Sequence, residues 1–67
     1  MEINKEYYVK RLKIDGKLLP QEKCTLLKIL EDNTCIVMNT DGQTRLFMLD
    51  MLSDEPDVVY GEMKSIN

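Results

Sequence analysis

Apolar and polar residues alternate over short stretches of the chain, and turn-forming residues separate these stretches. A period of two predicts half-buried β-strands, because successive side chains of a strand point to opposite faces of its sheet. Five extended segments follow from this pattern, over residues 6–14, 24–30, 35–40, 44–49 and 58–63. The sequence therefore predicts one all-β domain over residues 1–67, with an ordered part from about residue 6 to residue 63.

Turn signals mark the ends of these segments. Asp15-Gly16 ends the first segment, and Asp41-Gly42 separates the third from the fourth. Asp-Gly is a strong hairpin signal because glycine accepts a positive φ without steric cost. Residues 17–23 are expected to form an irregular connection. Residues 50–53 are too few for an α-helix and suit a single 3₁₀ turn before the last strand.

A two-residue loop at Asp32-Asn33 sets the register predicted for the second and third segments. It places Ile29 opposite Ile36 and Leu27 opposite Met38, so that these side chains share one apolar face. The predicted core combines that face with apolar residues of the other segments: Val9 or Tyr8, Leu12, Leu27, Ile29, Ile36, Met38, Leu46, Met48, Leu52 and Val59.

Residues 20–32 also fit a helix, with Pro20 at its first position and Asn33 closing it. Leu19 would then be the N-cap, and leucine is unfavourable at that position. Periodicity separates strand from helix least well in short apolar runs. We favour the strand here and keep the helix as the alternative.

The order of these segments resembles that of the SH3-like small barrels, a class that includes the Tudor modules. The resemblance is carried by LLKILEDNTCIVMNTDGQTRLFML followed by DML and VVYGEM: a long loop, tight hairpins, then one helical turn before the last strand. It is a likeness of architecture and implies a five-stranded SH3-like barrel that binds a peptide or nucleic acid. A Tudor-type aromatic cage would draw on Tyr7, Tyr8, Phe47 and Tyr60. No Trp and no ALYDY-like motif is present, so a proline-rich ligand is not expected.

The chain is short, and its charge is uneven along the sequence. A domain of 67 residues has a small core and leaves no second lobe with which to form a cleft. Residues 1–30 hold seven basic and four acidic residues, for a charge of +3, and residues 31–67 hold two basic and eight acidic, for −6. Whether two charged surfaces result depends on how the fold arranges the two halves.

Residue types that most catalytic and metal sites need are missing from the sequence. There is no His, which removes Ser-His-Asp and Cys-His systems and His-containing zinc sites. Cys24 and Cys35 cannot fill a zinc site alone, and the glycines form no phosphate-binding loop. The acidic stretch near Pro56 lacks the calcium-loop pattern. We expect no enzymatic activity, no cofactor and no metal.

Acidic residues around the last turn and strand form the favoured binding site. They are Asp50, Asp54, Glu55, Asp57 and Glu62. A compact acidic surface can bind a basic site on another protein through complementary electrostatic potential, as small phage-type inhibitors do. The favoured function is a non-enzymatic protein-binding module, in a regulatory or inhibitory role, that acts through this acidic surface.

Nucleic-acid binding through the first segment is the alternative function. Tyr8, Lys10, Arg11 and Lys13 would combine a stacking ring with positive charge, as small nucleic-acid-binding barrels do. The net charge of −3 weakens long-range attraction to a polyanion, so a protein partner is preferred.

Two further expectations concern self-association and location. Met38, Met48, Met51 and Met63 are adaptable apolar groups, and those left on a sheet face would favour a homodimer. The first residues are mostly charged, unlike a signal peptide, and no apolar stretch reaches the roughly 20 residues of a membrane span. We expect a cytoplasmic protein with reduced cysteines and no membrane association.

Overall fold

The computed structural model, which describes residues 1–66, is all-β, as predicted. Its elements are β1 (Glu6–Val9), β2 (Arg11–Ile14), β3 (Lys17–Leu18), β4 (Glu22–Ile29), β5 (Thr34–Asn39), β6 (Thr44–Met48), the 3₁₀ turn η1 (Leu49–Met51), β7 (Leu52–Ser53) and β8 (Val59–Met63). The first predicted segment is divided at Lys10, whose backbone N–H donates to the Met51 carbonyl at 2.7 Å. The predicted 3₁₀ turn forms, but it begins at Leu49 and is followed at once by the short strand β7.

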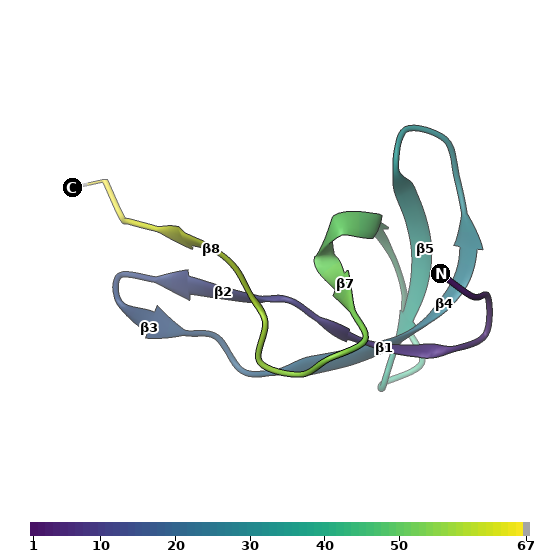
Figure 1. Cartoon of the computed structure of the whole chain (residues 1–67), viewed down its shortest axis with the longest axis horizontal. Coiled ribbons are helices and arrows are strands. Elements are labelled where there is room, and N and C mark those ends of the chain that lie inside the picture. The colour runs from purple at the N-terminus through teal and green to yellow at the C-terminus, as the bar shows by residue number, and fades with distance from the viewer. Residues whose placement is uncertain (67) are drawn as a thin grey trace.

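The strands form two sheets. The larger sheet has the order β6-β5-β4-β1-β7, and all its pairings are antiparallel. The smaller one, which we call the arm sheet, has the order β3-β2-β8 with β2 and β8 parallel. Figure 1 shows the arm sheet extending away from the β4–β5 hairpin, in a molecule of 38 × 23 × 20 Å. Within residues 1–66 the strands do not close into a barrel, so β6 and β7 remain edges of the larger sheet.

The segment for which a helix was the alternative is the strand β4. Cys24 and Leu26 point into the core, and Thr25 between them is only half-buried, which is the alternation of a strand. The three-residue η1 is the only helical element of the described chain. None of its helical segments is therefore long enough to span a bilayer.

The turn between β4 and β5 is longer than predicted. The Leu30 N–H donates to the Thr34 carbonyl at 2.9 Å, so three residues lie inside the turn instead of two. Asp32 and Asn33 both adopt the left-handed conformation there, with φ of 58° and 60°. Asn and Asp tolerate this region better than most residues, so the two polar residues fit the turn they were expected to form.

A bulge in β4 changes the predicted register a second time. The pairing shifts between Leu26 and Lys28, so that Leu26 lies opposite Val37 and Ile29 lies opposite Cys35. Without the bulge, Lys28 would share the face of Leu26, because strand faces repeat every two residues. The extra residue turns Lys28 to the other face and leaves the side of Leu26 free of charge in β4 and β5.

The core consequently lies on the face opposite to the one predicted. Its buried side chains come from β1, β4, β5 and β7 and are Tyr7, Val9, Cys24, Leu26, Cys35, Val37 and Leu52. Phe47, Leu49 and Met51 pack against this cluster. Burying the face of Ile36 would also have buried Lys28, and the desolvation of an unpaired ammonium exceeds what a methionine gains on burial.

The predicted core residues divide into three groups. Val9 and Leu52 are buried, as predicted. Half-buried positions are Tyr8, Leu12, Leu27, Ile36 and Met38. Four predictions are wrong, because these side chains are 43–67% exposed: Ile29, Leu46, Met48 and Val59. The reasons are structural, since Leu46 and Met48 lie on the outer face of the edge strand β6, and Val59 lies in the arm sheet.

Both Asp-Gly turns form, with different geometry. Asp15 and Gly16 both have positive φ, at 50° and 83°, the combination that matches the twist of a two-residue hairpin between β2 and β3. Asp41-Gly42 instead belongs to a three-residue loop in which Gly42 takes the left-handed position, with φ of 84°. The Asn39 side chain closes this loop by accepting from two backbone N–H groups at 3.0 Å.

Candidate protein-binding surfaces

The five acidic residues of the predicted binding surface lie on three parts of the structure. Asp50 is in η1, Glu62 is in β8, and Asp54, Glu55 and Asp57 are in the loop that joins β7 to β8. All five residues are exposed. They are therefore accessible to a partner, although they do not all project from one element.

Three of these five carboxylates already have partners within the chain. Asp54 forms an ion pair with Lys5 at 3.3 Å, and this hydrogen bond is the main reason that the pKa of Lys5 is raised. Asp50 accepts a hydrogen bond from the Asn33 side chain at 2.9 Å. Asp57 forms an ion pair with Arg11 at 2.9 Å. Across residues 1–66, Glu55 and Glu62 make no side-chain hydrogen bond or ion pair and are the carboxylates free to contact a partner.

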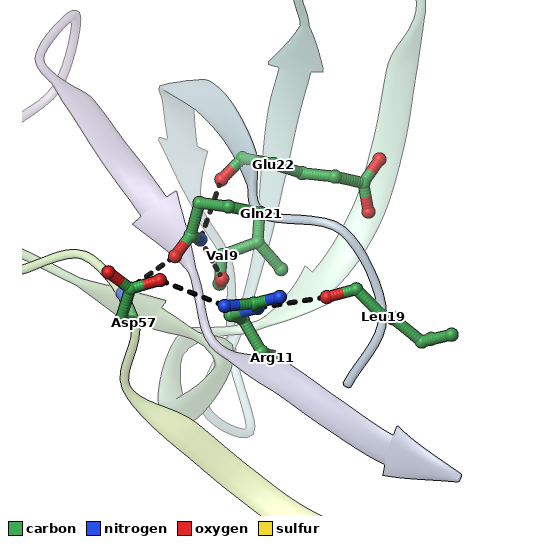
Figure 2. Close-up of polar contacts among 6 residues, drawn as sticks. All are labelled: Val9, Arg11, Leu19, Gln21, Glu22 and Asp57. Atoms are coloured by element: carbon green, nitrogen blue, oxygen red, sulfur yellow. Dashed lines mark hydrogen bonds and ion pairs between the residues drawn. The ribbon is translucent and has the colours of Figure 1, made fainter. Parts of the chain in front are cut away.

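A polar network, drawn in Figure 2, holds Asp57 in place. The Arg11 guanidinium donates through Nε to the Leu19 carbonyl and through a terminal nitrogen to the Asp57 carboxylate, both at 2.9 Å. The Gln21 side chain accepts from the Asp57 N–H at 2.6 Å and donates to the Val9 carbonyl at 2.7 Å. We call this set the Arg11–Asp57–Gln21 clamp. It joins the β1–β2 junction, the β3–β4 connection and the β7–β8 loop.

The clamp engages Arg11, a residue of the predicted nucleic-acid-binding site, in contacts within the fold. Arg11 is only 21% exposed and is engaged by two acceptors, so its charge is used inside the fold. Tyr8, Lys10 and Lys13 are half-buried. A residue outside the predicted site, Lys23, lies with Nζ 5.1 Å from the centre of the Tyr8 ring.

Lys23 was missed because its position beside Tyr8 depends on the pairing of β1 with β4. These two strands place Tyr8 directly opposite Lys23. No turn dipeptide or local pattern sets the register between strands that are separated by a long connection. A cross-strand pair of this kind therefore leaves no signal in the sequence.

The basic and acidic halves of the sequence are interleaved in space. Lys5 and Arg11 from the first half pair with carboxylates of the β7–β8 loop. Lys13 in β2 lies opposite Glu62 in the parallel strand β8. These contacts bring basic residues of the first half next to acidic residues of the second half, so the two charges are mixed around the β7–β8 loop and β8.

Within residues 1–66, no strand or helix packs over the arm sheet (Figure 1), and several of its large apolar side chains are exposed. The exposed members are Ile14 at 36%, Leu18 at 43%, Tyr60 at 48%, Val59 at 49% and Met63 at 58%. The register places Leu18 and Tyr60 on one face of this sheet and Ile14 and Met63 on the other, so both of its faces expose apolar side chains.

A small pocket lies where the arm sheet leaves the larger sheet. Its volume is about 160 Å³, and its walls are mainly apolar: Val9, Leu12, Leu19, Pro20, Phe47 and Met51. Pockets for cofactors and drug-sized ligands usually measure about 300–1,000 Å³. This pocket is therefore smaller than those that usually hold cofactors or drug-sized ligands.

The described residues show no arrangement suited to metal or thiolate chemistry. No group of three His, Cys, Asp or Glu side chains within residues 1–66 is placed to hold a metal ion. Cys24 and Cys35 are free and buried. Burial raises the pKa of Cys24 to about 11 and also raises the pKa of Cys35, so both thiols stay protonated near neutral pH.

The aromatic residues proposed for a Tudor-type cage are divided between the two sheets. Tyr7 lies in the core, whereas Tyr60 lies in the arm sheet. Surfaces open to a partner among residues 1–66 include the arm sheet with Glu55 and Glu62, the Tyr8–Lys23 pair and the edge strand β6. Comparison of the chain with protein-family models, with curated proteins and with solved structures finds no match.

Proposed function

We propose that the chain is a non-enzymatic protein-binding module whose partner covers the arm sheet. One observation carries this proposal: the three-stranded layer exposes Leu18, Tyr60 and Met63 by 43–58% and has no layer packed on it. Sheets in globular domains normally bury one face against another layer, and small isolated sheets are marginally stable in water. A protein partner would supply the missing layer.

The arm sheet exposes residue types that are common at protein–protein interfaces. Tyrosine and methionine are enriched at the centres of protein interfaces, and tyrosine is frequent among residues that dominate binding energy. Glu55 and Glu62 lie beside this surface with unpaired carboxylates and would favour a partner with basic residues around its contact site. Asp54 and Asp57 are assigned to folding contacts, because Lys5 and Arg11 already neutralise them.

The order of elements supports the same kind of function. A long excursion follows β1 and tight hairpins join β4, β5 and β6, as in the SH3-like resemblance, whereas η1 leads into the short strand β7 and not directly into the last strand. A module of this size would regulate or inhibit by occluding a surface of its partner. We place it in the cytoplasm, because free thiols persist in a reducing compartment.

A pull-down from nuclease-treated lysate tests the proposal. The tagged wild-type chain is compared with a Tyr60→Lys/Met63→Lys variant of the arm sheet and with Ile3→Lys, which changes a residue of similar exposure outside that sheet. We expect the arm variant to lose at least about tenfold of the recovered partner, because a lysine in an interface centre must be desolvated without a counter-charge. Ile3→Lys should recover the wild-type amount.

Nucleic-acid binding is the second candidate function, and the Tyr8–Lys23 pair favours it. A cation 5.1 Å from a half-buried ring resembles the stacking and charge elements of single-strand-binding sites. The same pull-down separates the candidates when it is repeated without nuclease. Recovery that needs nucleic acid, and that falls in Lys10→Glu/Lys23→Glu but not in the arm variant, would support this second function.

A further inference from the structure

The strand β6 forms an open edge of the larger sheet. Its backbone directions follow from two hydrogen bonds that flank it: Asn39 N–H donates to the Gln43 carbonyl, and Leu49 N–H donates to the Asn33 carbonyl, each at 2.9 Å. In an antiparallel ladder, alternate residues direct both backbone groups to the same neighbour. The β5–β6 register has no bulge, so Thr44, Leu46 and Met48 point their N–H and C=O groups away from β5.

Apart from the charged residue Arg45, this edge lacks the features that usually prevent strand association. Proteins protect exposed edges with proline, lysine, bulges or very short strands. The other edge of the sheet, β7, has two residues, whereas β6 has five, no proline, no lysine and a regular register. Leu46 at its centre is 67% exposed, the largest exposure of any apolar residue in a strand of the described chain.

We propose that the chain forms a twofold-symmetric homodimer in which β6 pairs antiparallel with β6 of a second copy. Leu46 lies on the axis and faces the partner's Leu46, while Thr44 faces the partner's Met48. The outward N–H and C=O groups of these three residues then form a complete ladder, and two five-stranded sheets join into one continuous sheet.

The side chains of β6 are compatible with pairing to themselves. On the outer face, Leu46 meets its own copy, and Ile36 and Met48 border this contact because they share that face. On the inner face, Arg45 lies opposite the partner's Phe47, an arrangement in which a cation meets an aromatic ring. No two like charges lie directly opposite each other in this register, since Arg45 is the only charged residue of the strand.

The accessible surface of the chain fits a partner of the same size. The structure exposes 4988 Å². A monomer of 7.8 kDa is expected to expose roughly 4,400 Å², so about 600 Å² is in excess. Pairing of β6 with a second copy would remove part of this excess, which also includes the uncovered arm sheet. A domain of this length is also marginally stable alone, and dimerisation stabilises it by mass action.

Sedimentation equilibrium of the purified protein tests the dimer. We expect the wild type to approach twice the 7.8 kDa chain mass as concentration rises. Leu46→Lys and Leu46→Glu should each remain monomeric, because each places like charges opposite each other across the axis. An equimolar mixture of the two variants should recover the dimer mass, since lysine then faces glutamate. Circular dichroism checks that both variants stay folded.

Mixing the two variants tests the register centred on Leu46, because only this register places residue 46 opposite residue 46 of the partner. A wild type that stays monomeric at every concentration, a Leu46→Lys variant that still dimerises, or a mixture that does not reassociate would each overturn the proposal. Hydrogen exchange gives a second measure: the Leu46 amide should slow with concentration, whereas the Arg45 amide, already directed at β5, should not. The dimer is independent of the proposed function, because Tyr60→Lys/Met63→Lys changes another surface and should leave the dimer mass unchanged.

Discussion

The Arg11 guanidinium and the Asp57 carboxylate lie 2.9 Å apart although 46 positions separate them in the sequence. This contact connects the start of β2 with the loop that leads into β8, and it therefore fixes where the arm sheet leaves the larger sheet (Figure 2). It also brings a cation of the basic half next to an anion of the acidic half. Part of the charge of each half is thus used in a contact within the fold.

Replacing Arg11 by methionine should destabilise the protein by about 1–2 kcal/mol. Most of this loss comes from the hydrogen bond to the Leu19 carbonyl and from packing of the half-buried side chain, since the Asp57 side chain is 70% exposed and its ion pair is screened by water. Urea denaturation measures the change. Lys17→Met, which removes an exposed charge without a contact, is the matched control and should stay within about 0.5 kcal/mol of the wild type.

Leu26 and Leu46 test which face of the larger sheet is the core. Leu26→Ala should cost about 2–5 kcal/mol, enough to unfold much of so small a domain, because the side chain is fully buried. Leu46→Ala should change stability by less than about 0.5 kcal/mol at concentrations where the chain is monomeric. Thermal unfolding followed by circular dichroism compares the two. If Leu46→Ala lowered the stability more than Leu26→Ala, the face of Leu46 would be the buried one.

The buried thiol of Cys24 should make stability depend on alkaline pH. Its pKa is raised to about 11, mainly by burial and secondarily by Cys35 and Glu22. Because an unfolded thiol ionises near pH 8.5, the stabilisation is complete below that pH. It should then fall by about 1.4 kcal/mol per pH unit until the folded thiol also ionises. Cys24→Val should reduce this slope in urea titrations, and an equal slope in both proteins would contradict the assignment.

Asp15 should titrate below the usual range of an aspartate. Its pKa is lowered because the side chain and backbone N–H of Ser65 both donate to the carboxylate. The folded pKa is lower than the unfolded one, so this contact stabilises the fold above the unfolded pKa and is lost as pH falls through the folded pKa. Carboxyl NMR titration of the wild type and Ser65→Ala measures the effect. The variant should move the midpoint upward, whereas an unchanged midpoint would rule out the contact.

Much of the secondary structure can be predicted from the sequence because its signals are local. Alternation within each run and the Asp-Gly turns identify the strands around them, and the poor N-cap at Leu19 argues against a helix in the segment that forms β4. The core face cannot be predicted in the same way. It depends on the bulge before Lys28, which reverses the faces of the last two residues of β4 and has no local signature.

The candidate site is less predictable than the strands. Exposure of the acidic residues follows from their position in a loop, but the neutralisation of Asp54 and Asp57 depends on side chains from distant segments. The apolar surface of the arm sheet also depends on contacts between segments that are distant in the sequence. Val59 and Ile14 are of residue types that are usually buried. They remain exposed because β8 pairs with β2 away from the larger sheet.

The most direct test of the protein-binding function is calorimetric titration of the captured partner into the wild type, the Tyr60→Lys/Met63→Lys variant and Ile3→Lys. We predict a saturable, stoichiometric complex with the wild type and Ile3→Lys, and an affinity at least about tenfold weaker, or about 1.4 kcal/mol, for the arm variant. Equal affinity for all three proteins would contradict the account, because it would show that the arm sheet is not the surface that binds.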